Sequence, residues 1–253
     1  MKLHFKKQGT GEPMVILHGL FGSSDNWQTH ANRLAAYFTV YLVDQRNHGH
    51  SRWSNDFNYD LLVEDLKNLV DEEGLETFIL LGHSMGGKTA MAFAQKYPDY
   101  LEKLIVVDIG VKQYPMHHQT ILAGLNAIDL SVVKTRGAAQ KQIEPYIEDL
   151  SVRQFLLKNL YWKEKGVLAW RINIPVLEAE MSNILAKLNE EESFVTTLFM
   201  RGGKSNYILD EDFDSLREHF PDSEIHTIEE AGHWIHAEAP KEFLDEVLGF
   251  CLR

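Results

Sequence analysis

The sequence contains a single cysteine among 253 residues. Cys251 therefore has no partner for a disulfide within the chain, and no cysteine pair is present to form a zinc-ligand motif. Apolar residues recur around it at helical spacing, so we expect a small packed side chain rather than a reactive thiol. The scarcity of cysteine excludes disulfide-stabilised scaffolds and cysteine-based zinc modules.

Basic residues are also scarce. The chain has 25 lysines and arginines against 37 aspartates and glutamates, a formal net charge of −12. This charge disfavours binding to nucleic acid or to an anionic membrane through a diffuse positive field. No apolar run is long enough to span a bilayer, and residues 1–13 lack the apolar core of a signal peptide. We expect a cytoplasmic protein with a small-molecule substrate, no nucleic-acid partner and no membrane span; nothing in the sequence indicates its oligomeric state.

Apolar residues make up 44% of the chain, enough for a large folded core. Short apolar runs alternate with amphipathic stretches along residues 1–110 and again along residues 194–253. This alternation predicts an α/β fold with a mostly parallel central sheet flanked by helices. The predicted strands are Leu3–Lys7, Met14–Leu17, Val40–Val43, Phe78–Leu81, Leu104–Val107, Phe194–Met200 and Glu224–Ile228.

The alternation stops over residues 111–193, which contain no convincing strand. Apolar residues at helical spacing predict helices around Ile121–Ile128, Phe155–Leu160 and Leu177–Leu188. We expect this segment to form a helical cap inserted between two parts of one core, residues 1–110 and 194–253.

The stretch Phe78–Pro98 combines a buried strand, a sharp turn and a helix. Between strand and helix, Gly82 to Gly86 reads GHSMG and matches G-x-S-x-G, the nucleophile-elbow pattern, in the context that the motif requires. The elbow holds its serine in a strained backbone conformation, so that Oγ projects toward a substrate. Strand and helix then approach so closely that a side chain at either glycine would collide. We therefore predict Ser84 as a nucleophile.

A glycine-bearing loop at residues 18–22 follows the second predicted strand. In hydrolases with this elbow, one oxyanion donor comes from such a loop and the other from the residue after the nucleophile. We assign these donors to the backbone N–H groups of Leu20 and Met85, with Phe21 as the next candidate for the loop donor. His18 is interpreted as a hydrogen-bonding support for the loop rather than as a catalytic base.

Two further loops contain histidines. His233 lies on a glycine turn after the last predicted strand, where the general base belongs when a triad follows the order Ser, Asp, His. Residues 44–51 contain His48 and His50, which form a weak metal-ligand set without a carboxylate cluster. We interpret this second loop as one held by an Asp44–Arg46 pair and a glycine turn.

Four motifs together resemble the YbfF-type esterases of the α/β-hydrolase superfamily: HGLFGSSDNW, DQRNHGHS, GHSMGGK and AGHWIHAE. The resemblance implies an α/β-hydrolase fold and a serine hydrolase that acts on acyl esters or thioesters under a helical cap. Matched motif to motif, Ser84 is the nucleophile and His233 is the base. This chemistry proceeds through an acyl-enzyme and needs no cofactor and no metal.

The acid of the triad departs from the usual pattern. Most α/β-hydrolases place it after the penultimate strand, often as G-x-x-D, and Ser205 stands at that position here. Asp210 comes later, in a predicted helix, whereas Asp108 ends the strand beside the elbow. Because YbfF-type enzymes have their acid after this earlier strand, we predict Asp108 rather than Asp210.

Other functions use a similar triad and elbow. A carbon–carbon bond hydrolase or a lyase of the menaquinone-pathway type would favour arginines for an acidic substrate, and Arg136, Arg153 and Arg171 are available in the predicted cap. A non-catalytic ligand receptor is a further alternative, since fold alone does not determine function. The presence of Ser84, His233 and Asp108 argues against a receptor.

Overall fold

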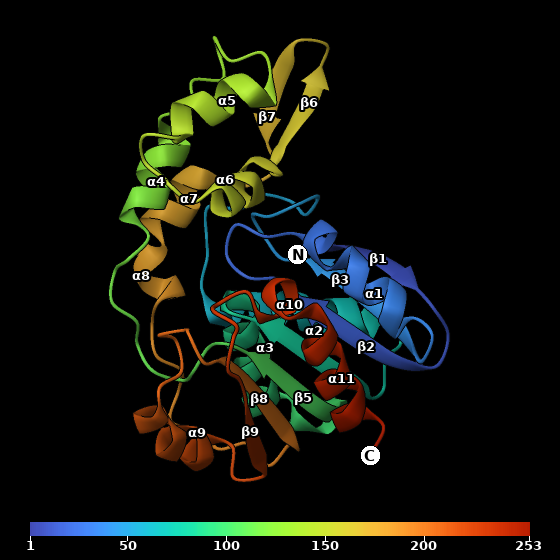
Figure 1. Ribbon diagram of the computed structural model, residues 1–253. Coiled ribbons are helices and arrows are strands. Elements are labelled where there is room, and N and C mark those ends of the chain that lie inside the picture. Colours follow the sequence, from blue (N-terminus) through green and yellow to red (C-terminus); the bar gives the residue numbers. More distant parts are fainter.

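A seven-stranded sheet forms the centre of the computed structural model, which describes residues 1–253 (Figure 1). The strand order is β1-β3-β2-β4-β5-β8-β9. The edge strand β1 runs antiparallel to β3, and every other neighbouring pair is parallel. The strands are β1 His4–Gln8, β2 Glu12–Leu17, β3 Phe38–Asp44, β4 Phe78–His83, β5 Leu101–Val107, β8 Thr197–Gly202 and β9 Ser223–Ile228. The predicted α/β fold and each predicted strand are confirmed, with boundaries shifted by a few residues.

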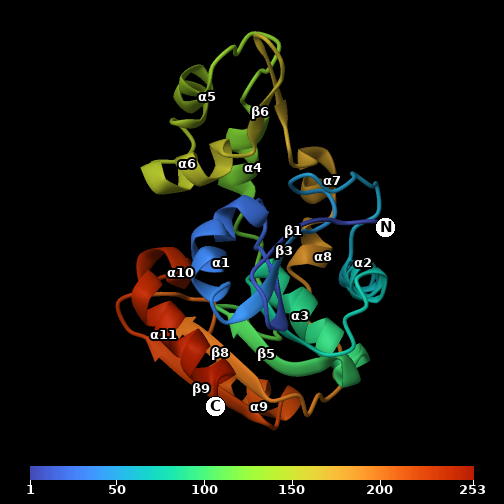
Figure 2. The same ribbon diagram turned by 90° about the vertical axis from the view of Figure 1, so that its right-hand side faces the viewer.

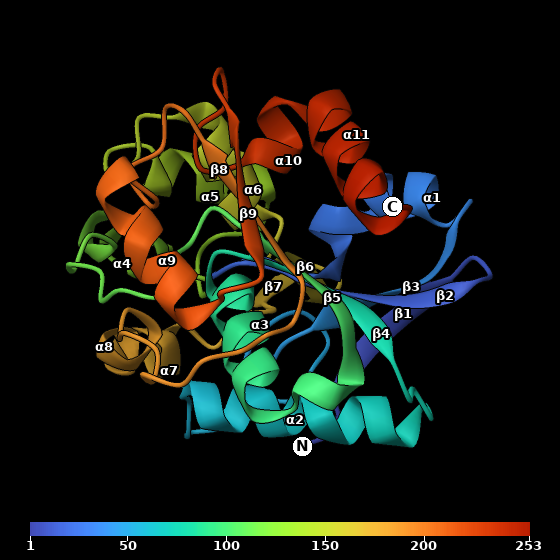
Figure 3. The ribbon, with the colours of Figure 1, turned by 90° about the horizontal axis from the view of Figure 1, so that it is seen from below.

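Two apolar cores lie on opposite faces of the sheet. In β4, Phe78 and Leu80 pack with α2 and α3, whereas Ile79 and Leu81 pack with α1 and α11, because successive side chains of a strand point to opposite faces (Figure 3). The core helices are α1 Gln28–Leu34, α2 Tyr59–Glu72, α3 Met85–Lys96, α9 Phe213–His219, α10 Ile235–Glu238 and α11 Pro240–Cys251. None of the helices is both long and apolar enough to cross a membrane.

Residues 26–38 also fit a helical pattern in the sequence, and the helix that forms there is shorter than this pattern. The pattern extends from Asn26 to Phe38, but a 3-10 turn, Ser24–Trp27, precedes α1, and α1 ends at Leu34. Phe38 instead begins β3, where only 2% of its surface stays exposed. Burial in the sheet therefore prevails over continuation of the helix.

The chain between β5 and β8 folds above the carboxyl ends of the strands, at the top of Figure 1. We call residues 111–193 the insertion; its status as a separate domain stays a prediction. Its elements are α4 Gln119–Asn126, α5 Arg136–Ile143, α6 Leu150–Leu157, β6 Leu160–Glu164, β7 Val167–Trp170, α7 Ile174–Ala179 and α8 Met181–Ile184.

The expectation that the insertion contains no strand is wrong. β6 and β7 form an antiparallel hairpin whose turn contains Gly166 at φ 80°. Helix α6 ends at Leu157, so Leu160 belongs to the hairpin, and Tyr161 and Trp162 are residues that favour strands. The third predicted helix is also divided, into α7 and α8.

The insertion leaves and rejoins the core through two segments that lie side by side. The Tyr114 N–H donates to the Leu185 carbonyl at 2.9 Å, and the Leu188 N–H donates to the Val111 carbonyl at 2.8 Å. The base of the insertion is therefore a short two-stranded connection.

A buried ammonium group joins this connection to the elbow helix. Lys88 of α3 has 1% of its surface exposed, and its Nζ donates to the carbonyls of Lys112, at 2.8 Å, and of Ala186. The same Nζ lies 5.0 Å from the centroid of the Tyr114 ring. Burial lowers the pKa of Lys88 to about 7.

Candidate active site

Ser84 lies in the sharp turn between β4 and α3, with φ 52° and ψ −120°. The two glycines of the motif permit this turn. A Cβ atom at Gly82 would lie 2.2 Å from the Gly86 carbonyl oxygen, and one at Gly86 would lie 2.5 Å from the Leu17 carbonyl oxygen. The close approach predicted for these positions is confirmed, and the strain at Ser84 is the kind that clusters at functional sites.

His233 lies in the turn between β9 and α10. Its Nδ1 donates to Oδ2 of Asp108 at 2.7 Å. The carboxylate of Glu238 accepts from the N–H of Gly232 at 2.7 Å and from the N–H of Trp234 at 3.1 Å, the residues on either side of the histidine. The backbone of this turn is therefore fixed from both sides, which orients the imidazole.

Three donors converge on the carboxylate of Asp108. This residue follows β5 directly, is fully buried and has φ 50°. Its Oδ1 accepts from the Gly202 N–H at 3.1 Å, and its Oδ2 accepts from both His233 and the Ser205 hydroxyl. The serine at the usual acid position thus donates to the acid that lies elsewhere. The sequence pointed to Ser205 only because this residue stands where the acid usually lies. Its hydrogen bond to Asp108 was not predicted.

The alternative acid lies away from the histidine. Asp210 begins the 3-10 turn Asp210–Asp212, its side chain is 83% exposed, and its Oδ1 pairs with Nη1 of Arg201 at 2.6 Å. The structure therefore brings Asp108, and not Asp210, to His233.

The two candidate donors of the glycine-bearing loop differ in whether their backbone N–H is already bonded. The Leu20 N–H makes no hydrogen bond within the chain. Met85 is the first residue of α3, where N–H groups have no partner inside the helix. The Phe21 N–H, by contrast, donates to Nε2 of His48 at 3.2 Å. Of the two loop candidates, Leu20 is the one whose donor is available.

His18 holds this loop, as predicted. Its Nδ1 donates to the Gly19 carbonyl at 2.8 Å, and its Nε2 accepts from the Gln45 N–H at 3.0 Å. Burial lowers the pKa of His18, which favours the neutral ring that both bonds require. Asn159 of the insertion adds a bond from its side chain to the Phe21 carbonyl at 2.8 Å.

The predicted Asp44–Arg46 pair is wrong. Asp44 is fully buried at the end of β3, and its carboxylate accepts from the N–H groups of Ser24, at 2.7 Å, and His50, at 2.9 Å. Arg46 instead pairs with Asp65 of α2, with Nε 2.6 Å from Oδ2. Buried backbone donors need acceptors, and the Asp44 carboxylate serves two of them.

Neutral histidines surround the site. Burial lowers the pKa of His236 to about 3 and that of His118 to about 4, and it lowers the pKa of His83 well below its ordinary value. His83 holds the turn of His233, because its Nε2 donates to the His233 carbonyl at 2.9 Å. The two nitrogens of His48 are both engaged by backbone groups, and no group of His, Cys, Asp or Glu side chains is arranged to hold a metal.

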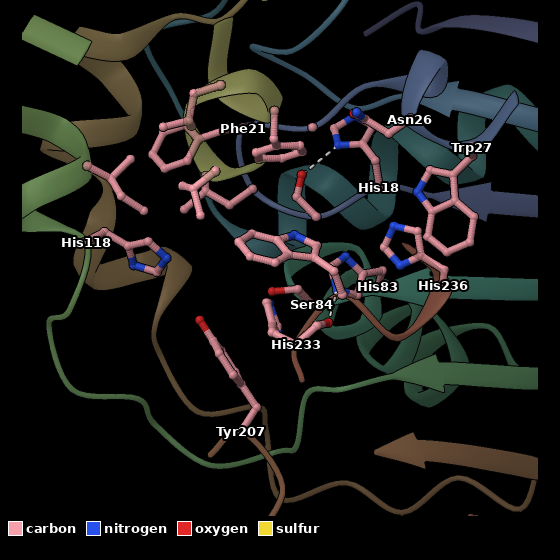
Figure 4. Close-up of a pocket in the computed structure, with 18 of the residues that line it drawn as sticks. His18, Phe21, Asn26, Trp27, His83, Ser84, His118, Tyr207, His233 and His236 are labelled. Atoms are coloured by element: carbon pink, nitrogen blue, oxygen red, sulfur yellow. Dashed lines mark hydrogen bonds between the residues drawn. The ribbon is translucent and has the colours of Figure 1, made fainter. Parts of the chain in front are cut away.

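A cavity of about 220 Å³ brings these parts together (Figure 4). Nineteen residues line it, and nine of them are hydrophobic. Ser84 and His233 lie next to each other in it, and the Tyr207 ring stacks on the His233 ring with centroids 3.8 Å apart. The insertion contributes His117, His118, Ile121, Val152, Phe155 and Leu156 to the lining. The sequence had left open which cap residues reach the site.

The arginines of the insertion do not line this cavity. Arg136 donates to the Leu160 carbonyl, and Arg171 lies over the Tyr161 ring. Arg153 is buried and donates to a backbone carbonyl of its own segment. The cavity therefore offers no guanidinium to an acidic substrate.

Comparison with known proteins identifies relatives of this chain. A family model described as "alpha/beta hydrolase fold" matches residues 12–240. "Esterase YbfF" of Escherichia coli K12 is 35% identical over 250 residues, which cover 96% of each protein. The mouse protein "sn-1-specific diacylglycerol lipase ABHD11" is 37% identical over 94% of this chain and 80% of its own length. The solved structure titled "Marine microorganism esterase" is 44% identical, with a TM-score of 0.96 and coverage of 98% and 99% of the two chains.

Proposed function

The chain belongs to the α/β-hydrolase family as a carboxylic ester hydrolase, and on that premise we propose that it cleaves acyl esters or thioesters through Ser84, His233 and Asp108. The observation that carries this proposal is the bond of 2.7 Å between Asp108 and His233, in the cavity that also contains the strained Ser84. These are the nucleophile, base and acid of a serine hydrolase, recognised by geometry and role.

In the first step, Ser84 Oγ attacks the acyl carbonyl carbon and its proton passes to Nε2 of His233. Asp108 keeps the proton of the imidazole on Nδ1 and stabilises the imidazolium that forms. The N–H groups of Leu20 and Met85 receive the negative charge that develops on the carbonyl oxygen. Each such donor lowers the barrier by about 3 kcal/mol in measured oxyanion holes.

In the second step, the imidazolium gives its proton to the leaving oxygen or sulfur, and the alcohol or thiol departs from the acyl-enzyme. Water then attacks the acyl carbonyl while His233 accepts its proton. The serine is restored and a carboxylic acid is released. The cavity of about 220 Å³ favours a small or medium acyl group.

The alternatives are less well supported. A carbon–carbon bond hydrolase or a menaquinone-pathway-type lyase with an acidic substrate needs cationic groups at the site, and the arginines of the insertion are engaged elsewhere. A non-catalytic receptor gives no reason for the strained backbone at Ser84 and Asp108.

Replacement of Ser84 tests the proposal. We expect Ser84→Ala to lower turnover of acyl esters and thioesters on the order of a million-fold, as in other serine hydrolases, and to abolish labelling by a fluorophosphonate. Ser131→Ala, on the exposed surface of the insertion, is the matched control and should keep both. Labelling retained in Ser84→Ala would remove this residue from the mechanism. A panel of esters and thioesters graded in acyl length should then show fastest turnover for short chains.

A further inference from the structure

A second hollow adjoins the cavity and has a different lining. It is a groove of about 530 Å³, and only three of its twelve lining residues are hydrophobic, against nine of nineteen in the cavity. The two spaces share Asn26, Phe155, Trp234 and His236 in their walls. Figure 2 shows the setting, with α6 of the insertion above α1 and α10, which lie next to each other.

The two long walls of the groove present polar side chains to each other. Ser151, Gln154 and Lys158 come from α6 and its C-terminal residue, at spacings that place them on one helix face, and Thr29 of α1 lies across from them. None of these side chains makes a hydrogen bond or an ion pair within the protein. Asn26 accepts from the Ser23 N–H through Oδ1, which leaves its Nδ2 free. Donors that the fold does not use therefore line the groove.

The groove begins on the side of the catalytic base. Trp234 and His236, which follow His233 closely in the chain, line both the groove and the cavity, and Ala237 and Glu238 line the groove alone. In an acyl transfer the base protonates the leaving group, so the leaving group must lie beside the base. The apolar part of the cavity, toward Ile121 and Leu156, is then left for the acyl chain.

We infer that the groove is the subsite for the leaving group, and that this leaving group is an uncharged, polyhydroxylated alcohol. Free amide, hydroxyl and ammonium donors suit hydroxyl oxygens. One lysine, in a groove that Glu238 also lines, makes a poor site for a strong anion. The carboxylate of Glu238 already accepts two backbone N–H groups, so it does not select a cation. This inference rests on the proposed esterase function and adds the identity of the alcohol.

The test compares two esters with one acyl group, glyceryl monobutyrate and propyl butyrate. In the double variant Gln154→Leu/Lys158→Met, both changes lie at exposed positions of the insertion. We expect kcat/KM for the glyceryl ester to fall roughly tenfold, since two hydrogen bonds are lost, while the value for the propyl ester stays unchanged. Lys163→Met, on the exposed hairpin, is the matched control and should leave the ratio as in the wild type. A ratio unchanged in the double variant, or an equal loss for both esters, overturns the inference.

Two further measurements test the opposite wall of the groove and the charge of the alcohol. Thr29→Val, on the opposite wall, should lower the glyceryl-to-propyl ratio about twofold to threefold; an unaltered ratio would contradict the assignment of that wall. A butyrate ester of glycerol phosphate tests the charge of the alcohol, and faster turnover of this ester than of the glyceryl ester would overturn the uncharged class. Ser84→Ala should be inactive on every ester. If it is inactive while the double variant keeps the wild-type ratio, the inference fails and the proposed function stands.

Discussion

The core and the insertion shape the same cavity by different means. Every non-glycine residue with positive φ belongs to the core, and three of these, Phe21, Ser84 and Asp108, lie at the site. The insertion has no such residue, and it contributes side chains from α4, from α6 and from the two histidines just before α4. The core therefore holds the proposed reacting groups in strained, heavily bonded positions, whereas the insertion supplies a wall. We expect changes in the core to alter chemistry and changes in the insertion to alter substrate preference.

Among the changes that test this comparison, the one at Asp108, the proposed acid, has the largest expected effect. Asp108→Asn keeps a residue type that tolerates positive φ, but it removes the charge that orients His233. We expect turnover to fall on the order of ten-thousand-fold, as when the triad acid is amidated in other serine hydrolases. Asp210→Asn, the control, should be nearly silent because that carboxylate is exposed. Steady-state kinetics with one ester decide between them, and a greater loss in Asp210→Asn would return the acid to the conventional loop.

The second effect concerns stability in acid. Burial lowers the pKa of His48 and of His236 to about 3, so both are neutral in the folded core. In the unfolded chain the same two histidines become protonated below about pH 6.5. The unfolded state then holds more protons, and the free energy of unfolding falls as the pH drops from about 6.5 toward 3. Between pH 6.5 and pH 5 we expect a loss of about 2 kcal/mol from each histidine.

Urea unfolding at a series of pH values measures this loss. His236→Gln should flatten the profile, and His117→Gln, at an exposed histidine of the insertion, should not. Hydrogen exchange at pH 5 should show weakened protection in the core. A core that keeps its protection while the insertion opens would contradict the comparison between the two regions.

The smallest effect links the two regions. Asn159 of the insertion donates to the Phe21 carbonyl in the loop that supplies the Leu20 N–H. Asn159→Ala removes this hydrogen bond and a second one, from the same amide to the Leu156 carbonyl within the insertion. Because only the first reaches the loop, we expect kcat to fall about fivefold for every ester, with little change in the preference between esters. Asn183→Ala, whose amide bonds only to Glu180 on the surface, is the control. A change in ester preference without a change in kcat would mean that this contact acts on the wall rather than on the loop.

Much of the fold could be predicted because burial leaves a periodic pattern in sequence. The β4 run from Phe78 to Leu81 is apolar throughout, as a strand covered on both faces must be. The hairpin β6–β7 was missed because Leu160 to Trp162 is a short apolar run directly after a helix, and periodicity cannot assign such runs. The helix pattern that extends to Phe38 is also not followed to its end, because burial of Phe38 in β3 overrides helical spacing.

The candidate site could be predicted where residues stand at strand ends. The elbow follows β4 and Asp108 follows β5, and neighbouring parallel strands bring their carboxyl ends together. Ser205, Asn159 and Lys88 act through hydrogen bonds to residues far away in the chain. Such contacts leave no local pattern in the sequence. The wrong prediction of an Asp44–Arg46 pair shows that closeness in sequence does not identify the partners either.

The ammonium of Lys88 has a consequence for how this enzyme can diversify. Its Nζ donates hydrogen bonds to the backbone carbonyls of Lys112 and Ala186, one in each connection of the insertion, and to no side chain of either residue. Any insertion whose two connections place backbone carbonyls at these positions can accept the same two hydrogen bonds, whatever its side chains. Lys88 can therefore anchor insertions of different sequence on α3, while Ser84 at the start of this helix keeps its position.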